Sequence, residues 1–112
     1  MKIHTYLSSS GKDLIMEYIN ALTIEEQVDG LAVLAYMEKG EFEKVLSKRW
    51  DKKVYEVYFR RNNRIFYVTA DRDNIYLLHV WRKQKNKTER VDKNIVLARA
   101  RELGGFLGRK IV

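Results

Sequence analysis

The chain has 112 residues and a formal net charge of +7 at neutral pH, with 46% hydrophobic and 33% charged residues. This composition is typical of an ordered globular protein and excludes a disordered chain, so residues 1–112 are interpreted as a single domain. The absence of cysteine excludes disulfide bonds and thiolate metal sites, and the two histidines, His4 and His79, lie far apart in the sequence. We therefore expect neither a metal site nor a cofactor.

Neither a signal peptide nor a membrane span is visible in the sequence. Residues 1–13 lack the hydrophobic segment of a signal peptide, and no apolar run approaches the length of a membrane helix. We expect a cytoplasmic protein with no membrane partner.

The positive charge is concentrated in the second half of the chain. Residues 1–43 carry three basic against eight acidic side chains, a net charge of −5, whereas residues 44–81 carry +5 and residues 82–112 carry +7. Focused positive potential attracts the phosphates of nucleic acids. A basic face that only keeps the protein soluble is the alternative, but this segregation favours a nucleic-acid partner.

The first half of the chain predicts a short strand followed by two helices. Residues 2–7 alternate weakly between apolar and polar side chains, and residues 12–22 carry apolar side chains at helical spacing. Thr23 and Glu26 are spaced as in a capping box that begins a second helix, and Gly40 indicates its end.

The second half predicts strands and a closing helix. The predicted strands are residues 44–50, residues 54–61, the segment after Asn63, and residues 75–81. The last strand is almost continuously apolar, which indicates a central position in a sheet. Residues 90–103 predict a helix that ends at Gly104-Gly105. This order implies an α+β fold, with two N-terminal helices and a C-terminal helix packed on a small antiparallel sheet.

One turn decides which side chains share a face of this sheet. Asn62-Asn63 predicts a two-residue hairpin loop, because asparagine tolerates positive φ. This loop pairs Tyr58 with Tyr67 and places Arg60 on the same face as both tyrosines.

Several short segments form an ordered pattern over the second half of the chain. In chain order they are Tyr55-Glu56-Val57-Tyr58, Arg64, Leu78-His79-Val80-Trp81, Arg82-Lys83 and Lys87-Thr88. Together with the N-terminal helix pair, the pattern resembles the RelE/ParE toxin superfamily, in particular its phage-derived, HigB-like branch. Four positions depart from the family pattern: Tyr58 replaces an arginine, Val80 a glycine, Gln84 a lysine and Glu89 a proline.

The resemblance implies a RelE-like fold and the toxin of a type II toxin–antitoxin pair. Such a toxin cleaves mRNA at the ribosome, inhibits translation, and is neutralised by a cognate helix-turn-helix antitoxin. It is similar to metal-independent endoribonucleases, in which the 2′-hydroxyl of the RNA attacks the neighbouring phosphodiester and leaves a 2′,3′-cyclic phosphate. Two alternatives stay open: a ParE-like, non-enzymatic inhibitor of DNA gyrase, and a phage nucleic-acid-binding protein without catalysis.

Cations are needed because this reaction accumulates negative charge on the phosphate in its transition state. We predict that Arg60 and Arg64 contact the phosphate, since a guanidinium binds two phosphate oxygens at once. Lys83 adds further positive charge.

The reaction also needs groups that transfer protons. His79 is the main candidate, because a histidine titrates near neutral pH. Tyr67 is predicted as the second group, with Tyr58 as the alternative. Each of these residues also has a purely structural interpretation. His79 could be a hydrogen-bonded histidine of the core, and the tyrosines could simply pack within the strands.

A further set of residues is predicted to bind RNA without taking part in the chemistry. These residues are Lys48, Trp81, Arg82, Lys85 and Lys87. Packing is the alternative role for Trp81, and protection of an edge strand is the alternative for Lys48.

Overall fold

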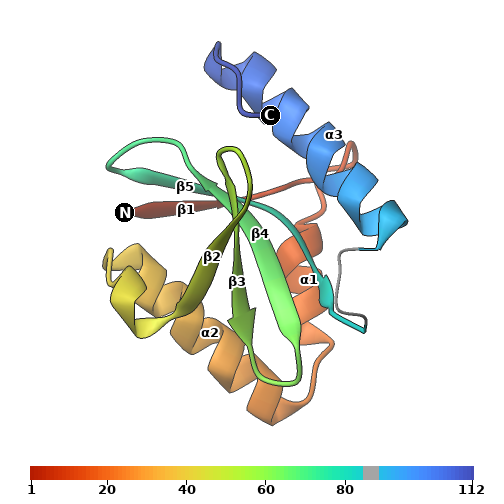
Figure 1. The fold of residues 1–112 in the computed structure, drawn as a ribbon. Coiled ribbons are helices and arrows are strands. Elements are labelled where there is room, and N and C mark those ends of the chain that lie inside the picture. Colours follow the sequence, from red (N-terminus) through yellow and green to blue (C-terminus); the bar gives the residue numbers. More distant parts are fainter. Residues whose placement is uncertain (85–88) are drawn as a thin grey trace.

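The computed structural model describes residues 1–84 and 89–112. Its elements follow the predicted order of one strand, two helices, four strands and a final helix (Figure 1). The strands are β1 (Lys2–Thr5), β2 (Leu46–Asp51), β3 (Val54–Phe59), β4 (Asn63–Thr69) and β5 (Asn74–Arg82). The helices are α1 (Leu14–Asn20), α2 (Ile24–Glu38) and α3 (Arg90–Leu107), with a short 3-10 helix, η1 (Phe42–Lys44).

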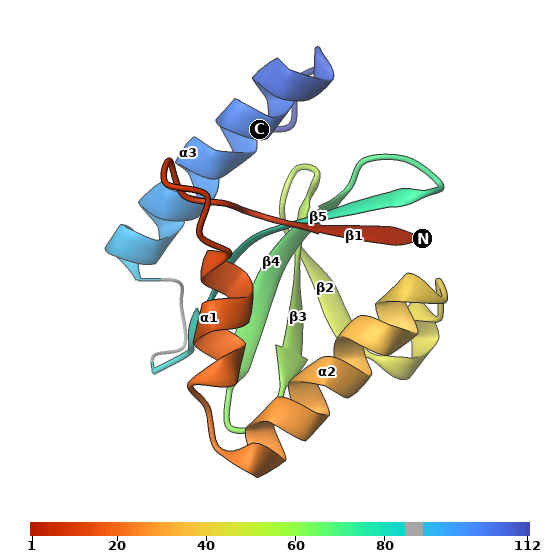
Figure 2. The ribbon, with the colours of Figure 1, turned by 180° about the vertical axis from the view of Figure 1, so that it is seen from behind.

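The five strands form one sheet in the order β1-β5-β4-β3-β2 (Figure 2). This arrangement confirms the α+β class and shows β5 as an interior strand between β1 and β4, with β4 in the middle of the sheet. The sheet is mixed, however, because β1 runs parallel to β5, with Ile3 opposite Ile75. The prediction of a wholly antiparallel sheet was wrong on this point. The long connection between β1 and β5 lets both strands run in the same direction, which a short hairpin does not allow.

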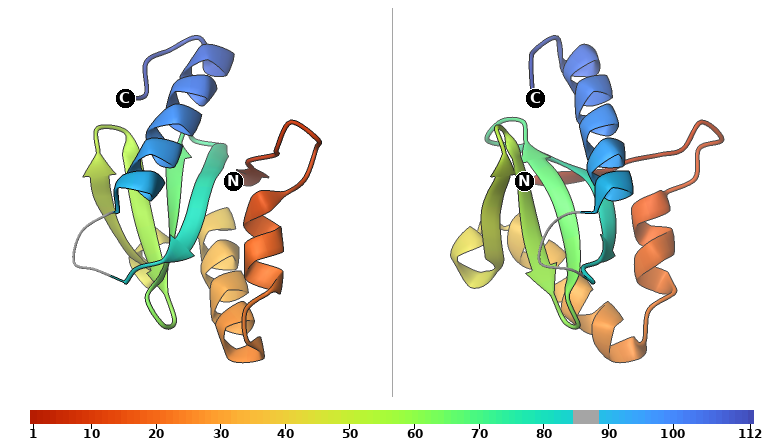
Figure 3. Two further views of the ribbon diagram at one scale, coloured as in Figure 1. Left: turned by 90° about the vertical axis from the view of Figure 1, so that its right-hand side faces the viewer. Right: turned by 45° about the vertical axis from the view of Figure 1, so that its right-hand side comes forward.

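Helices cover both faces of the sheet (Figure 3). On the face covered by α1 and α2, a core forms around fully buried side chains such as Ile19, Met37 and Ile65. On the opposite face, α3 covers a second core that includes Phe66 and Val96. We call these the α1–α2 face and the α3 face. Within residues 1–84 and 89–112, no helix combines the length and the apolar character needed to span a membrane.

The hairpin between β3 and β4 has a three-residue loop, residues 60–62, in place of the predicted two-residue loop. Tyr58 pairs with Arg64, and Tyr67 pairs with Tyr55. The prediction that Tyr58 and Tyr67 pair and share a face with Arg60 was therefore wrong. Tyr58 lies on the α3 face and Tyr67 belongs to the core of the α1–α2 face.

Asn63 shifts the register because its buried side chain is bound to α2. Its Nδ2 donates a hydrogen bond of 2.7 Å to the carboxylate of Glu26, which is 1% exposed. As predicted, Thr23 caps α2, since its Oγ1 accepts a hydrogen bond of 3.3 Å from the Glu26 backbone N–H. The hydrogen bond from Asn63, and then that from Arg82, hold the pKa of Glu26 below its ordinary value. Asn63 therefore begins β4, and the loop ends one residue earlier than predicted and begins two residues earlier.

The C-terminal helix continues beyond its predicted end at Gly104-Gly105. It reaches Leu107 and ends at Gly108, whose φ of 72° favours glycine. Gly104 remains inside the helix, where a Cβ would lie 2.6 Å from the carbonyl oxygen of Arg109. The close approach at Gly104 lets the last residues fold back and bury Ile111, which is 4% exposed.

Candidate functional site

The candidate site lies on the α3 face, where β2, β3, β4 and β5 run side by side. Cross-strand pairing places Tyr58 of β3 beside Arg64 of β4, and Arg64 beside Trp81 of β5. The next set of cross-strand neighbours on the same face is Glu56 of β3, Phe66 of β4 and His79 of β5, with Phe66 in the middle. The register of three strands therefore brings together residues that are up to 25 positions apart in the sequence.

Arg64 and Glu56 form a buried ion pair at the floor of this site. The Nη1 of Arg64 donates to Glu56 Oε2 at 3.1 Å, and the two side chains are only 3% and 2% exposed. The guanidinium also lies over the ring of Trp81, 4.7 Å from its centroid. Trp81 itself is stacked on Phe66, with the centroids 4.6 Å apart. Arg64 is thus held rigidly between a carboxylate and aromatic rings.

Tyr58 lies above this pair and is surrounded by cations. The ammonium groups of Lys48 and Lys83 lie 5.5 and 5.6 Å from the centre of its ring. Its hydroxyl donates a short hydrogen bond to Glu56 and accepts one of 3.4 Å from Arg64. Lys48 also approaches Glu56, at 3.5 Å. Tyr58, and after it Glu56, raise the pKa of Lys48, so this ammonium stays charged at neutral pH.

His79 is bonded on both sides of its ring by α3. Its Nε2 lies 2.9 Å from Asp92 Oδ1, and its Nδ1 lies 3.3 Å from Arg99 Nη1. Because a guanidinium only donates, Nδ1 must accept, and the ring proton resides on Nε2 facing Asp92. Burial is the main cause that lowers the pKa of His79 below its ordinary value, although Asp92 opposes it. His79 is therefore a neutral ring that links β5 to α3.

Three of the predicted residues lie apart from this cluster. Arg60 is in the hairpin loop, where its Nη1 binds Glu25 at 2.8 Å. Arg82 donates to Glu26 at 2.7 Å. Tyr67 lies on the opposite face of the sheet. The structure thus brings together Arg64, His79, Trp81, Lys48 and Lys83, but not Arg60, Arg82 or Tyr67. Lys85 and Lys87 fall outside the described residues.

The sequence interpretation missed the partners that hold the site together. Asp92 and Arg99 are seven residues apart, a spacing that places both side chains on one face of a helix. That spacing was the available signal for a polar contact from α3 to β5. Glu56 was visible in the family pattern, but its contacts depend on the β3–β4 register.

Together, the fold and this site define a small α+β protein in which one sheet face presents buried and exposed cations around a tyrosine. The model of the phage-derived Gp49-like family (DUF891) matches residues 17–101. The chain therefore belongs to this family of phage-derived, toxin-like proteins. Comparison with curated proteins gives no match.

Proposed function

We propose that this protein is a HigB-like toxin of a type II toxin–antitoxin pair, which cleaves mRNA at the ribosome without a metal ion. The observation that carries the proposal is the position of Tyr58 among Lys48, Lys83 and Arg64. A proton-transfer group next to several cations is what attack by a 2′-hydroxyl on a phosphodiester requires.

In the proposed reaction, the Tyr58 hydroxyl accepts the proton of the attacking 2′-hydroxyl while its own proton passes to Glu56. The new bond joins the 2′-oxygen to phosphorus, and the bond from phosphorus to the 5′-oxygen breaks. Lys48 and Lys83 neutralise the charge that develops on the phosphate oxygens, and one of these ammonium groups protonates the leaving 5′-oxygen. The products are a 2′,3′-cyclic phosphate and a 5′-hydroxyl.

Arg64 and His79 act as positioning residues in this proposal. Arg64 fixes the Glu56 carboxylate and does not face solvent, while His79 fixes α3 against the sheet. Lys85 and Lys87, which lie outside the described residues, are proposed to bind RNA through their charge. The proposed antitoxin is a helix-turn-helix protein encoded beside the toxin gene, and co-expression of that protein should restore growth.

The test is expression of the wild-type chain and of Tyr58→Phe in growing cells, with cuts in messages mapped by primer extension. We expect cuts with the wild type, and a rate lower by about 10²–10⁴ with Tyr58→Phe, since that is the usual effect of removing a proton-transfer group. Tyr36→Phe is the matched control, because this half-buried tyrosine lies on α2, and it should cleave normally. Intact messages at doses of wild type that arrest growth would contradict the proposal.

A second candidate function is RNA binding without cleavage. The observation that favours it is the burial of Arg64, whose guanidinium is bonded to Glu56 and is not presented to a phosphate. In this case the purified protein would bind RNA with a strong salt dependence, and both the wild type and Tyr58→Phe would leave the RNA whole.

A further inference from the structure

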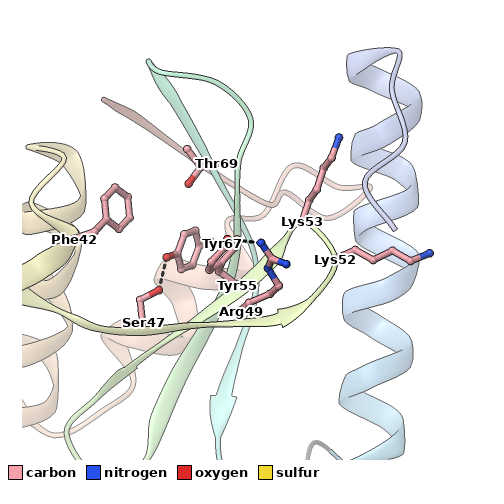
Figure 4. A pocket seen from close by; sticks show the side chains of 8 residues that line it. All are labelled: Phe42, Ser47, Arg49, Lys52, Lys53, Tyr55, Tyr67 and Thr69. Carbon is pink, nitrogen blue, oxygen red and sulfur yellow. Dashed lines mark hydrogen bonds between the residues drawn. The ribbon is translucent and has the colours of Figure 1, made fainter.

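A hollow lies on the other side of the sheet from Tyr58. It has a volume of about 570 Å³, within the range of small-molecule sites in proteins (Figure 4). Its lining residues are Phe42, Ser47, Arg49, Lys52, Lys53, Tyr55, Tyr67 and Thr69. Tyr67 is part of the core of the α1–α2 face, and Phe42 and Tyr55 pack against that core. None of the candidate-site residues on the α3 face lines this hollow among the described residues.

Three aromatic rings form the floor of the hollow. The rings of Phe42 and Tyr67 are 6.1 Å apart and nearly parallel, with an interplanar angle of 20°. The ring of Tyr55 lies 5.9 Å from that of Tyr67. Tyr67 is fixed by burial and by a hydrogen bond to Ser47. Such a rigid aromatic surface suits the flat face of a nucleobase, which stacks on aromatic side chains.

One cation lies beside these rings, and two more lie in the turn at the edge of the hollow, where the side chain of Lys52 points away from the rings (Figure 4). Arg49 lies over the ring of Tyr55, 5.8 Å from its centre, and its Nη2 donates to the Tyr55 hydroxyl at 3.4 Å. Lys52 and Lys53 are exposed in the β2–β3 turn (Figure 4). Lys52 keeps a φ of 50°, a conformation in which glycine or asparagine is usual. The eight described lining residues include no carboxylate, so the positive charge is not neutralised within the hollow.

We propose that this hollow binds a nucleotide unit, with the base on the half-buried rings of Phe42 and Tyr55, which the buried Tyr67 supports, and the phosphate near Arg49 and Lys53, with Lys52 adding positive charge from the turn. The unit is either a free nucleotide or one nucleotide of a single strand, since both present a base joined to a phosphate. The site goes beyond the proposed ribonuclease function because it lies on the opposite face of the sheet. The site binds its ligand and catalyses no reaction on it. Burial raises the pKa of Tyr67, so its phenol stays neutral.

The first experiment is a titration of the ¹⁵N-labelled protein followed by amide NMR shifts. The probes are AMP, inorganic phosphate, and a short oligodeoxythymidylate that cannot be cleaved because it has no 2′-hydroxyl. We expect AMP or the oligonucleotide to shift amides around Ser47, Tyr55 and Tyr67, and phosphate alone to shift them much less. A response to AMP alone identifies a free nucleotide, and a response to the oligonucleotide alone identifies a single strand. No shift at these residues with either probe, or equal shifts with phosphate, would overturn the proposal.

The second experiment compares two variants of equal net charge. Lys52→Asn with Lys53→Gln removes two cations of the hollow and keeps a residue that tolerates positive φ at the turn. Lys2→Gln with Lys12→Gln removes two exposed lysines elsewhere. For the oligonucleotide, the first variant should reduce the slope of log affinity against log salt by up to about 0.7, the value for one phosphate contact on a single strand. Equal slopes and equal affinities for both variants would refute the site.

The aromatic floor is tested separately by Tyr55→Leu, which should weaken AMP or oligonucleotide binding about tenfold or more, since a base–aromatic stack contributes at least that order of affinity. Unfolding by urea is measured in parallel, and the lysine variant provides the test if Tyr55→Leu does not fold. Tyr58→Phe should bind the probes in this hollow like the wild type. A failure of the ribonuclease proposal and a failure of this site are therefore distinguished.

Discussion

Arg64 carries a charge into the interior of the protein, where the residue is 2% exposed. The energetic cost of removing a guanidinium from water is offset by the carboxylate of Glu56 and by the ring faces of Trp81 and Phe66. The same contacts orient Glu56 toward Tyr58. The geometry of the candidate site therefore depends on one buried ion pair.

Removal of one partner of this pair should destabilise the fold strongly. Glu56→Ala leaves Arg64 buried without its carboxylate, so we expect the free energy of unfolding to fall by about 3–5 kcal/mol in urea denaturation. The double variant Glu56→Ala with Arg64→Met removes both charges and should regain part of that loss. If the single variant loses less than about 1 kcal/mol of unfolding free energy, groups other than Glu56 stabilise the buried charge of Arg64.

His79 makes stability depend on pH in a defined direction. Its pKa in the folded protein is below the ordinary value of 6.5, so the unfolded chain binds a proton more readily than the folded one. The contribution of His79 is therefore fully present above about pH 6.5 and is lost as the pH falls toward the lowered pKa. Urea denaturation between about pH 7 and pH 5 should show this decline, and His79→Gln should reduce it. His4→Gln is the control and should keep the decline.

At the scale of elements, the β3–β4 hairpin decides which residues meet. The sequence identified both strands, but the loop length depended on Asn63, whose amide binds the buried Glu26 of α2. That contact spans 37 residues and is not visible in the local sequence. A shift of register by one residue moves side chains to the other face of a sheet. For this reason Tyr58 lies with Arg64, whereas Tyr67, three residues after Arg64 on the same strand, faces the other side in either register.

The hairpin loop gives a test of this register. Arg61 has a φ of 60°, which disfavours residues with a Cβ and β-branched residues most of all. Arg61→Gly should be neutral or stabilising, and Arg61→Val should lower the free energy of unfolding by about 1–2 kcal/mol. Arg72→Val, in an exposed turn where φ is not positive, is the control, with an expected change within about 0.5 kcal/mol. Equal effects at both positions would contradict the three-residue loop.

At the scale of the whole molecule, the sheet separates two cores that serve different parts of the surface. The core on the α1–α2 face supports the aromatic hollow around Tyr67, while the core on the α3 face supports the site around Tyr58. The C-terminal tail completes the second core, because Ile111 is 4% exposed. Stability of the α3 face therefore depends on the last residues of the chain.

This role of the tail predicts a large effect at a position close to the C-terminus. Ile111→Ala should lower the free energy of unfolding by about 2–5 kcal/mol, because it leaves a cavity in the second core. Val91→Ala on α3 is the matched control, since Val91 is 70% exposed, and it should change stability by no more than about 0.5 kcal/mol. If both substitutions have similar small effects in urea denaturation, the C-terminal tail contributes little to the stability of the fold.

The sequence by itself determined the α+β class, the order of the elements, the cap of α2 at Thr23 and the interior position of β5. These features follow from the local spacing of apolar residues and from capping chemistry, both of which depend on residues only a few positions apart in the sequence. Only the tertiary structure decided the parallel pairing of β1, the register that joins Tyr58 to Arg64, and the contacts of His79 with Asp92 and Arg99. Those features depend on contacts between distant segments, and the energy of such contacts is set by burial and hydrogen bonding in the folded chain.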